Sequence, residues 1–186
     1  MQPISNMSET EFVLVAFSIM LALAFAKLMQ GLVRGATCEG RYWIHLAWTL
    51  HRLLGAFLYF WAFKTLLDRI GGFTFYEFTS VIFSPMLFYA QALLLCPEQP
   101  AEVKDWRNYF EEIRKPFFAL YLAIMLGNVN IVVTLDIDIP VAAFLVQLVT
   151  GIVGMYSSNE KVHGALVSIN FLSIGLGIAL PIMMSI

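Results

Sequence analysis

Arg52 is the residue whose chemistry most needs an explanation, because it lies inside a stretch that is long and apolar enough to cross a bilayer. The stretch runs from Tyr42 to Leu67. A charge at bilayer depth costs from about 2.5 kcal/mol on insertion scales to more than about 10 kcal/mol in simulations, so the side chain is expected to face protein or water. Helical spacing places several polar and aromatic side chains on one face: His45, Trp48, Thr49, Arg52 and Tyr59. This face predicts a helix inside a bundle, with Arg52 as a charge that attracts anions.

Every predicted helix carries one polar side chain near its middle. These residues are Ser18, Arg52, Ser84, Asn128, Gln147 and Asn170. They have two interpretations. In the first they are polar contacts between packed helices, each contributing about 0.6 kcal/mol on average. In the second they form a midplane binding site or hydrated pathway, where the kink expected at Pro85 exposes backbone carbonyls. The candidate ligand-binding residues of that second interpretation are Arg52, Trp48, Ser84, Asn128, Gln147 and Asn170.

Histidines and a pair of carboxylates suggest an alternative, a membrane enzyme with its chemistry at an interface. The candidates are His45, His163 and the pair Glu111 and Glu112. Their spacing matches no known catalytic arrangement, so we assign no catalytic residue. His45 and His51 point in different directions on one helix, which argues against shared ligation of a haem or a metal ion. We therefore expect no cofactor and no metal.

The composition places the chain in lipid. Hydrophobic residues make up 60% of the 186 residues and charged residues 13%, and the mean hydropathy is +0.78, whereas soluble domains contain about 25% charged residues. A net charge of -2 excludes a basic surface for nucleic acid. The two cysteines, Cys38 and Cys96, fall on the side predicted to be cytoplasmic, so no disulfide is expected. The expected partner is the lipid bilayer, with a second copy of the chain or a membrane subunit as further options.

Hydropathy divides the chain into six apolar stretches within a single transmembrane domain, 1–186. The spacing predicts an all-α fold, a polytopic membrane helix bundle with six transmembrane helices. The expected ranges are 10–33, 42–67, 73–96, 117–135, 139–156 and 162–184.

The hydrophilic stretch between the third and fourth helices predicts an amphipathic segment at the membrane interface, over residues 101–115. Its apolar positions recur at helical spacing and are expected to face the membrane or the bundle: Trp106, Tyr109, Phe110 and Ile113. The carboxylates of Glu111 and Glu112 and the amine of Lys115 are expected to remain in water. Pro116 is expected to begin the fourth helix. An ordinary amphipathic connector explains the same pattern.

The distribution of cations predicts the orientation of the chain. Eight lysines and arginines flank the connections after the first, third and fifth helices, namely Lys27, Arg34, Arg41, Lys104, Arg107, Arg114, Lys115 and Lys161. The opposite side has only Lys64 and Arg69. The positive-inside rule therefore places these three connections in the cytoplasm and both termini on the extracytoplasmic side of a cell inner membrane.

Two sequence features resemble a group of uncharacterised bacterial multi-pass membrane proteins. The first is the end of the opening helix, Lys27 to Leu32, and the second is the Tyr-Trp-x-His-Leu-x-Trp entry to the second helix, Tyr42 to Trp48. The resemblance extends from Phe12 to about Phe118. It implies a bacterial multi-pass protein and carries no activity. The expected role is small-solute transport or that of a membrane subunit in an assembly, in preference to that of an enzyme.

Overall fold

The described part of the chain is built from α-helices, with one short 3-10 helix between the third and fourth. The computed structural model describes residues 8–67, 74–134 and 141–184. The elements are α1 (Glu9–Thr37), α2 (Trp43–Leu67), α3 (Phe75–Leu95), η2 (Pro100–Glu102), α4 (Trp106–Thr134), α5 (Val141–Tyr156) and α6 (Glu160–Met184). The prediction of an all-α chain with six helices is confirmed.

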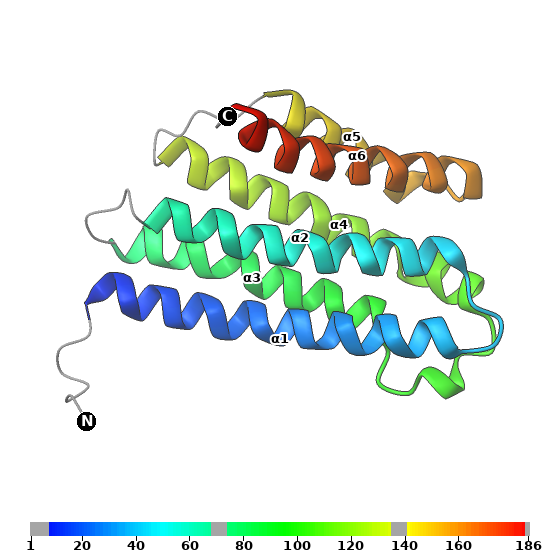
Figure 1. Cartoon of the computed structure of the whole chain (residues 1–186). Coiled ribbons are helices and arrows are strands. Elements are labelled where there is room, and N and C mark those ends of the chain that lie inside the picture. Colours follow the sequence, from blue (N-terminus) through cyan, green and yellow to red (C-terminus); the bar gives the residue numbers. More distant parts are fainter. Residues whose placement is uncertain (1–7, 68–73, 135–140, 185–186) are drawn as a thin grey trace.

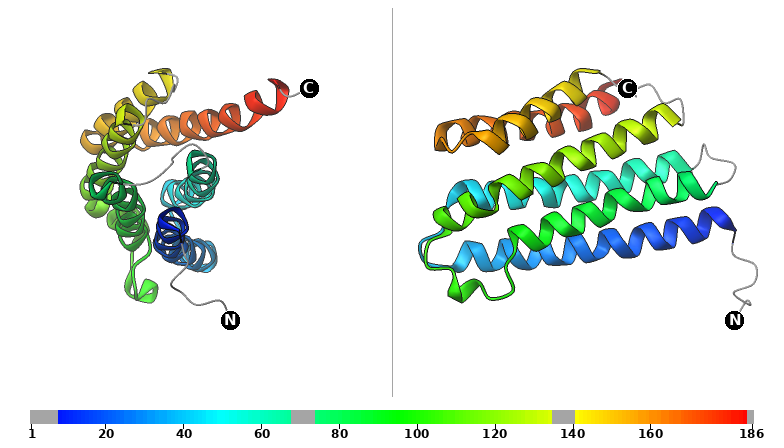
Figure 2. Two further views of the ribbon diagram at one scale, coloured as in Figure 1. Left: turned by 90° about the vertical axis from the view of Figure 1, so that its left-hand side faces the viewer. Right: turned by 180° about the vertical axis from the view of Figure 1, so that it is seen from behind.

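The helices run in alternating directions, so that α1 begins and α6 ends at the same end of the bundle (Figure 1). Successive packing joins α1 to α3, α3 to α4 and α4 to α5. Helix α2 packs on α1 and α6 and makes smaller contacts with α3 and α4. In the end-on view of Figure 2, α3, α4 and α5 form a curved row, α1 and α2 lie beside it, and α6 extends from the row at a steep angle. The connections after α1, α3 and α5 lie at the opposite end. We call this end, which carries Arg41, Lys104, Arg107 and Lys161, the basic end.

Two helices begin with a capping box, in which a hydroxyl and a carboxylate satisfy the free backbone N–H groups of the first turn. Ser8 and Glu11 form this motif at the start of α1, and Thr74 and Glu77 form it at the start of α3. The predicted start of the third helix at residue 73 falls outside the described residues. The Glu77 carboxylate accepts hydrogen bonds from the Thr74 backbone N–H at 2.7 Å and from the Thr74 hydroxyl at 2.8 Å.

Helix α4 corrects the prediction of a separate interfacial segment over 101–115. Helix α4 is continuous from Trp106 to Thr134 and contains Pro116 in its interior, so the prediction that Pro116 begins the helix is wrong. The buried stripe runs across the proline at helical spacing, through Trp106, Phe110, Ile113, Phe117 and Tyr121. Burial of these side chains outweighs the one backbone hydrogen bond that a proline removes. Trp106, Phe110 and Ile113 are buried and Glu112 and Lys115 exposed, as expected, whereas Glu111 is half-buried.

Glycines allow close helix contacts at several places in the described chain, two of which involve Gly31 and Gly154. A Cβ on Gly31 of α1 would lie 2.7 Å from the Cβ of Cys96, at the end of α3, and a Cβ on Gly154 of α5 would lie 2.5 Å from the Phe118 ring of α4. Both separations are shorter than any real Cβ contact, so these helices approach each other only because the glycines lack side chains. Cys38 and Cys96 are free thiols in the structure.

Two helices of the described chain are long and apolar enough to cross a membrane, α1 and α3. A shorter apolar stretch covers Phe144–Tyr156 in α5. These helices favour a membrane protein, and the number of spans is taken up under the proposed function.

Candidate functional site: the Arg52 centre

Arg52 lies in the interior of the bundle, where only 6% of the residue is exposed. The Cζ atom of its guanidinium lies 4.0 Å from the centroid of the Phe88 ring of α3 and 5.2 Å from that of the Tyr121 ring of α4. Both rings therefore offer their faces to the charge in a cation–π arrangement. The prediction that Arg52 faces the interior is confirmed. The guanidinium thus lies against aromatic rings, whereas the sequence predicted that Arg52 shares a midplane layer with Asn128, Gln147 and Asn170.

Polar atoms without a protein partner gather around Arg52. In the described chain, the buried atoms with no hydrogen bond include Arg52 Nε and Nη2, Trp48 Nε1, His51 Nδ1 and Gln91 Oε1. Buried polar groups in native proteins are nearly always hydrogen-bonded, so several unpaired ones in one region indicate a place where a ligand or water binds. We call Trp48, His51, Arg52, Phe88, Gln91 and Tyr121 the Arg52 centre.

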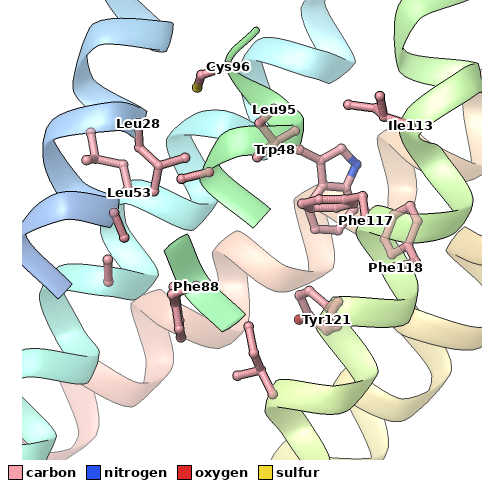
Figure 3. Packing of buried hydrophobic residues seen from close by; sticks show 14 of the residues in the cluster. Leu28, Trp48, Leu53, Phe88, Leu95, Cys96, Ile113, Phe117, Phe118 and Tyr121 are labelled. Carbon is pink, nitrogen blue, oxygen red and sulfur yellow. The ribbon is translucent and has the colours of Figure 1, made fainter. Parts of the chain in front are cut away.

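Ring contacts hold the α2 side of this centre in place. Trp48 is fully buried, and its ring lies 5.4 Å from that of His51 and 6.2 Å from that of Tyr121. Figure 3 shows Trp48 beside Phe117 and Phe118 of α4. On α3, the Gln91 amide donates to the Phe117 carbonyl oxygen at 3.0 Å. These contacts hold the side chains of Trp48, His51 and Gln91 in place, while Trp48 Nε1, His51 Nδ1 and Gln91 Oε1 remain without a hydrogen bond.

Asn170 joins the Arg52 centre through Tyr121. The Tyr121 hydroxyl donates to Asn170 Oδ1 at 2.8 Å, and Asn170 Nδ2 donates to Thr150 Oγ1 at 2.7 Å and to the Leu166 carbonyl oxygen at 2.8 Å. The chain of hydrogen bonds connects α4, α5 and α6. It also fixes the orientation of the Tyr121 ring against the Arg52 guanidinium.

Asn128 and Ser84 form a second polar group, at the junction of α2, α3 and α4. Asn128 Oδ1 accepts from the Tyr59 hydroxyl at 3.2 Å and from the Ser84 hydroxyl at 3.5 Å. This group continues toward the end opposite the basic end, where Asn130 Nδ2 donates to Ser80 Oγ at 3.2 Å. Polar side chains thus lie between α3 and α4 toward that end, and Tyr59 of α2 joins them through Asn128.

The other two midplane residues do not join these groups. The Ser18 hydroxyl donates to the Leu14 carbonyl oxygen of its own helix at 2.6 Å. Gln147 is half-buried on α5, and the hydrogen bonds described for the two groups do not include it. Of the six predicted binding residues, the structure therefore brings Trp48, Arg52 and Asn170 together around Tyr121, places Ser84 with Asn128, and leaves Gln147 apart.

The basic end holds the candidates for the enzyme alternative. His45 Nε2 lies 2.8 Å from the Leu95 carbonyl oxygen, and His163 Nε2 lies 2.7 Å from the Ser157 carbonyl oxygen. The Phe110 ring contacts both imidazoles, at 6.4 Å and 5.4 Å between centroids. The histidines therefore bond to backbone and pack around an aromatic ring. Among the described residues, no three His, Cys, Asp or Glu side chains come together as a metal site.

A nearby tyrosine also contributes to packing. The Tyr109 hydroxyl donates a hydrogen bond to the Leu94 carbonyl oxygen at 2.7 Å, and its ring lies 5.7 Å from that of Trp106.

Arg114 is the important residue that sequence reasoning missed, because it was counted among the cations flanking the basic loop. It is buried, and its Nη1 donates to the carbonyl oxygens of Met155 at 2.8 Å and Ser157 at 2.6 Å. Its Nε forms an ion pair with Glu111 at 3.0 Å. One signal was available: Arg114 lies at helical spacing between Phe110 and Phe117, on the buried face of α4.

Comparison of the chain with protein-family models, with curated proteins and with solved structures yields no match. The fold and the Arg52 centre define an all-α protein with two helices apolar enough for a membrane and a buried, unpaired cation.

Proposed function

We propose that the protein is an integral protein of a bacterial inner membrane, with six spans, and that the Arg52 centre lies on the path of a small solute. The observation that carries this proposal is that polar side chains lie inside and large apolar side chains outside, the reverse of the distribution in a soluble protein. The interior buries His51, Arg52 and Asn170, whereas every one of the six helices exposes large apolar side chains. Examples are Phe12, Phe57, Phe83, Leu126, Leu145 and Leu172.

Such an exterior is unsuited to water, because soluble monomers rarely expose large continuous apolar surfaces. Hydrocarbon, in contrast, favours apolar side chains outside and requires polar ones to face inward. Length supports the same conclusion for α2, α4 and α6, since 25 or more residues at 1.5 Å each exceed the roughly 30 Å of hydrocarbon. Helix α5, with 16 described residues, is the shortest of the six.

A transport role is favoured over polar packing by the unpaired atoms of the Arg52 centre. Polar residues that serve only to join helices form hydrogen bonds with each other, as Asn128, Ser84 and Tyr59 do. Arg52 Nε and Nη2, in contrast, form no hydrogen bond with the protein. The enzyme alternative has weaker support: His45 Nε2 and His163 Nε2 each bond to a backbone carbonyl, and His163 Nδ1 is the one unpaired buried atom of these two histidines in the described chain.

The orientation is tested with reporter fusions. With the basic end in the cytoplasm, a reporter fused after Ile186 is expected to be active only on the extracytoplasmic side. A second fusion in the turn between α5 and α6, after Ser158, should be active only in the cytoplasm. Cytoplasmic activity of the fusion after Ile186 would contradict the six-span topology.

Solute passage is tested by osmotic swelling of vesicles that contain the purified protein. We expect swelling at least several-fold faster than in protein-free vesicles when the outer solution holds isosmotic erythritol, a neutral solute, or potassium lactate with valinomycin to carry the cation. Vesicles containing the Arg107→Met variant, altered at an exposed residue, provide the matched control and should swell like the wild type. Rates equal to those of protein-free vesicles with both solutes would refute the transport role.

A further inference from the structure

The unpaired atoms of Arg52 are the two that form one edge of its guanidinium. Nε and Nη2 carry parallel N–H bonds on the same side of the planar group, and neither has a protein partner. This edge matches the two oxygens of a carboxylate in a bidentate pair, which is stronger and more directional than a single hydrogen bond. The Phe88 and Tyr121 rings lie over the guanidinium and restrict its movement.

The surroundings of this edge also favour an anion. Trp48 lies one helical turn before Arg52 on the same face of α2, and both side chains pack against Tyr121. The edge itself offers two unused donors and no acceptor, an arrangement that suits an anion with oxygen atoms.

Charge balance selects the class of anion. Within the Arg52 centre, Arg52 supplies the one permanent charge, while the other buried arginine of the described chain, Arg114, is occupied by Glu111 and by backbone carbonyls. In a medium of low dielectric constant, an ion without a counterion carries a large desolvation cost. One negative charge offsets Arg52, whereas a phosphate group with about 1.5 to 2 negative charges leaves an excess.

We infer that the Arg52 centre binds the carboxylate of a small monocarboxylate through the Nε–Nη2 edge of Arg52. The inference rests on the proposed function in that it names the solute class for the same site. Binding at equilibrium, however, is measured without any passage across a membrane, so the two proposals are separable.

The experiment measures the thermal unfolding midpoint of the purified protein in detergent, titrated with sodium acetate. Acetamide, which has the shape of acetate without the charge, controls for the carboxylate, and sodium chloride and sodium phosphate control for anions in general. We expect acetate alone to raise the midpoint in a saturable manner, because a ligand that binds only the folded state stabilises it. An equal rise with acetamide, chloride or phosphate, or no rise with acetate, would overturn the assignment.

Two variants place the binding at this edge. Arg52→Lys keeps the charge but removes the two parallel donors, and it should weaken the apparent acetate affinity at least tenfold. Arg52→Met removes the charge as well, and it should abolish the response to acetate. Arg107→Lys, at an exposed position, should leave the affinity unchanged. Wild-type affinity in Arg52→Lys, or a saturable response to acetate in Arg52→Met, would refute the inference.

The outcomes separate the two proposals. Acetate binding without solute passage in vesicles would leave the inference standing and remove the transport role. Passage of erythritol without acetate binding would leave the transport role standing and remove the inference.

Discussion

Replacing Arg114 by methionine is expected to lower the stability of the protein by about 3 kcal/mol, because a buried charged donor that satisfies several groups is lost. Arg114 reaches from α4 to the C-terminal end of α5, where its Nη1 bonds to the carbonyl oxygens of Met155 and Ser157. The last carbonyls of a helix have no partner within the helix, and a cation placed there also complements the helix dipole. Methionine keeps much of the apolar stem but leaves these carbonyls and the Glu111 carboxylate without their cation.

Arg107 provides the matched control, since it lies on the same helix and also pairs with a glutamate. Its ion pair with Glu160 has an N–O distance of 3.7 Å, and the arginine side chain is 60% exposed. Exposed pairs contribute about 0 to 1 kcal/mol, so Arg107→Met should barely move the thermal midpoint in detergent. Similar losses in the two variants would show that Arg114 does not hold the α5–α6 turn on α4.

The sequence predicted the helices and the burial of Arg52 because both depend on hydropathy along one dimension. A long run of apolar residues predicts a membrane-crossing helix, and the high cost of a charge in hydrocarbon predicts that Arg52 faces the interior of the bundle. The partners of Arg52 were not predictable in the same way. Position along the helix predicts that Asn128 and Asn170 lie at the same depth as Arg52, but it does not give the direction in which neighbouring helices point these side chains. In the structure, the amide oxygens of Asn128 and Asn170 accept hydrogen bonds from Tyr59 and Tyr121.

Helix α4 shows a second limit of sequence reasoning. Pro116 itself, and the change from a hydrophilic to an apolar composition beside it, are both reasonable signals for the start of a helix. The buried stripe from Phe110 through Phe117 was an opposing signal, and the structure shows that burial prevailed. Arg114 was misjudged for the same reason, because a cation beside a hydrophilic loop was assigned to water although its position fell within the stripe.

Replacing Arg52 by methionine is expected to have the opposite effect to the same change at Arg114. Arg52 carries a buried charge whose Nε and Nη2 have no protein partner, and the Phe88 and Tyr121 faces offset only part of its desolvation cost. An apolar side chain of similar length removes that cost and packs against the same rings. In the absence of ligand, Arg52→Met should therefore keep or raise stability, by up to about 3 kcal/mol.

The two methionine variants thus distinguish a binding site from a structural contact. A side chain with a structural role raises the stability of the fold, whereas a side chain with a ligand-binding role can lower that stability as long as no ligand is bound. We expect the Arg52→Met protein to insert normally, to keep or raise its thermal midpoint in detergent, and to lose its response to acetate completely. If the thermal midpoint of Arg52→Met, measured without ligand, fell as much as that of Arg114→Met, Arg52 would be a helix-packing residue. Its loss would then destabilise the protein as much as the loss of a buried arginine whose hydrogen bonds are satisfied.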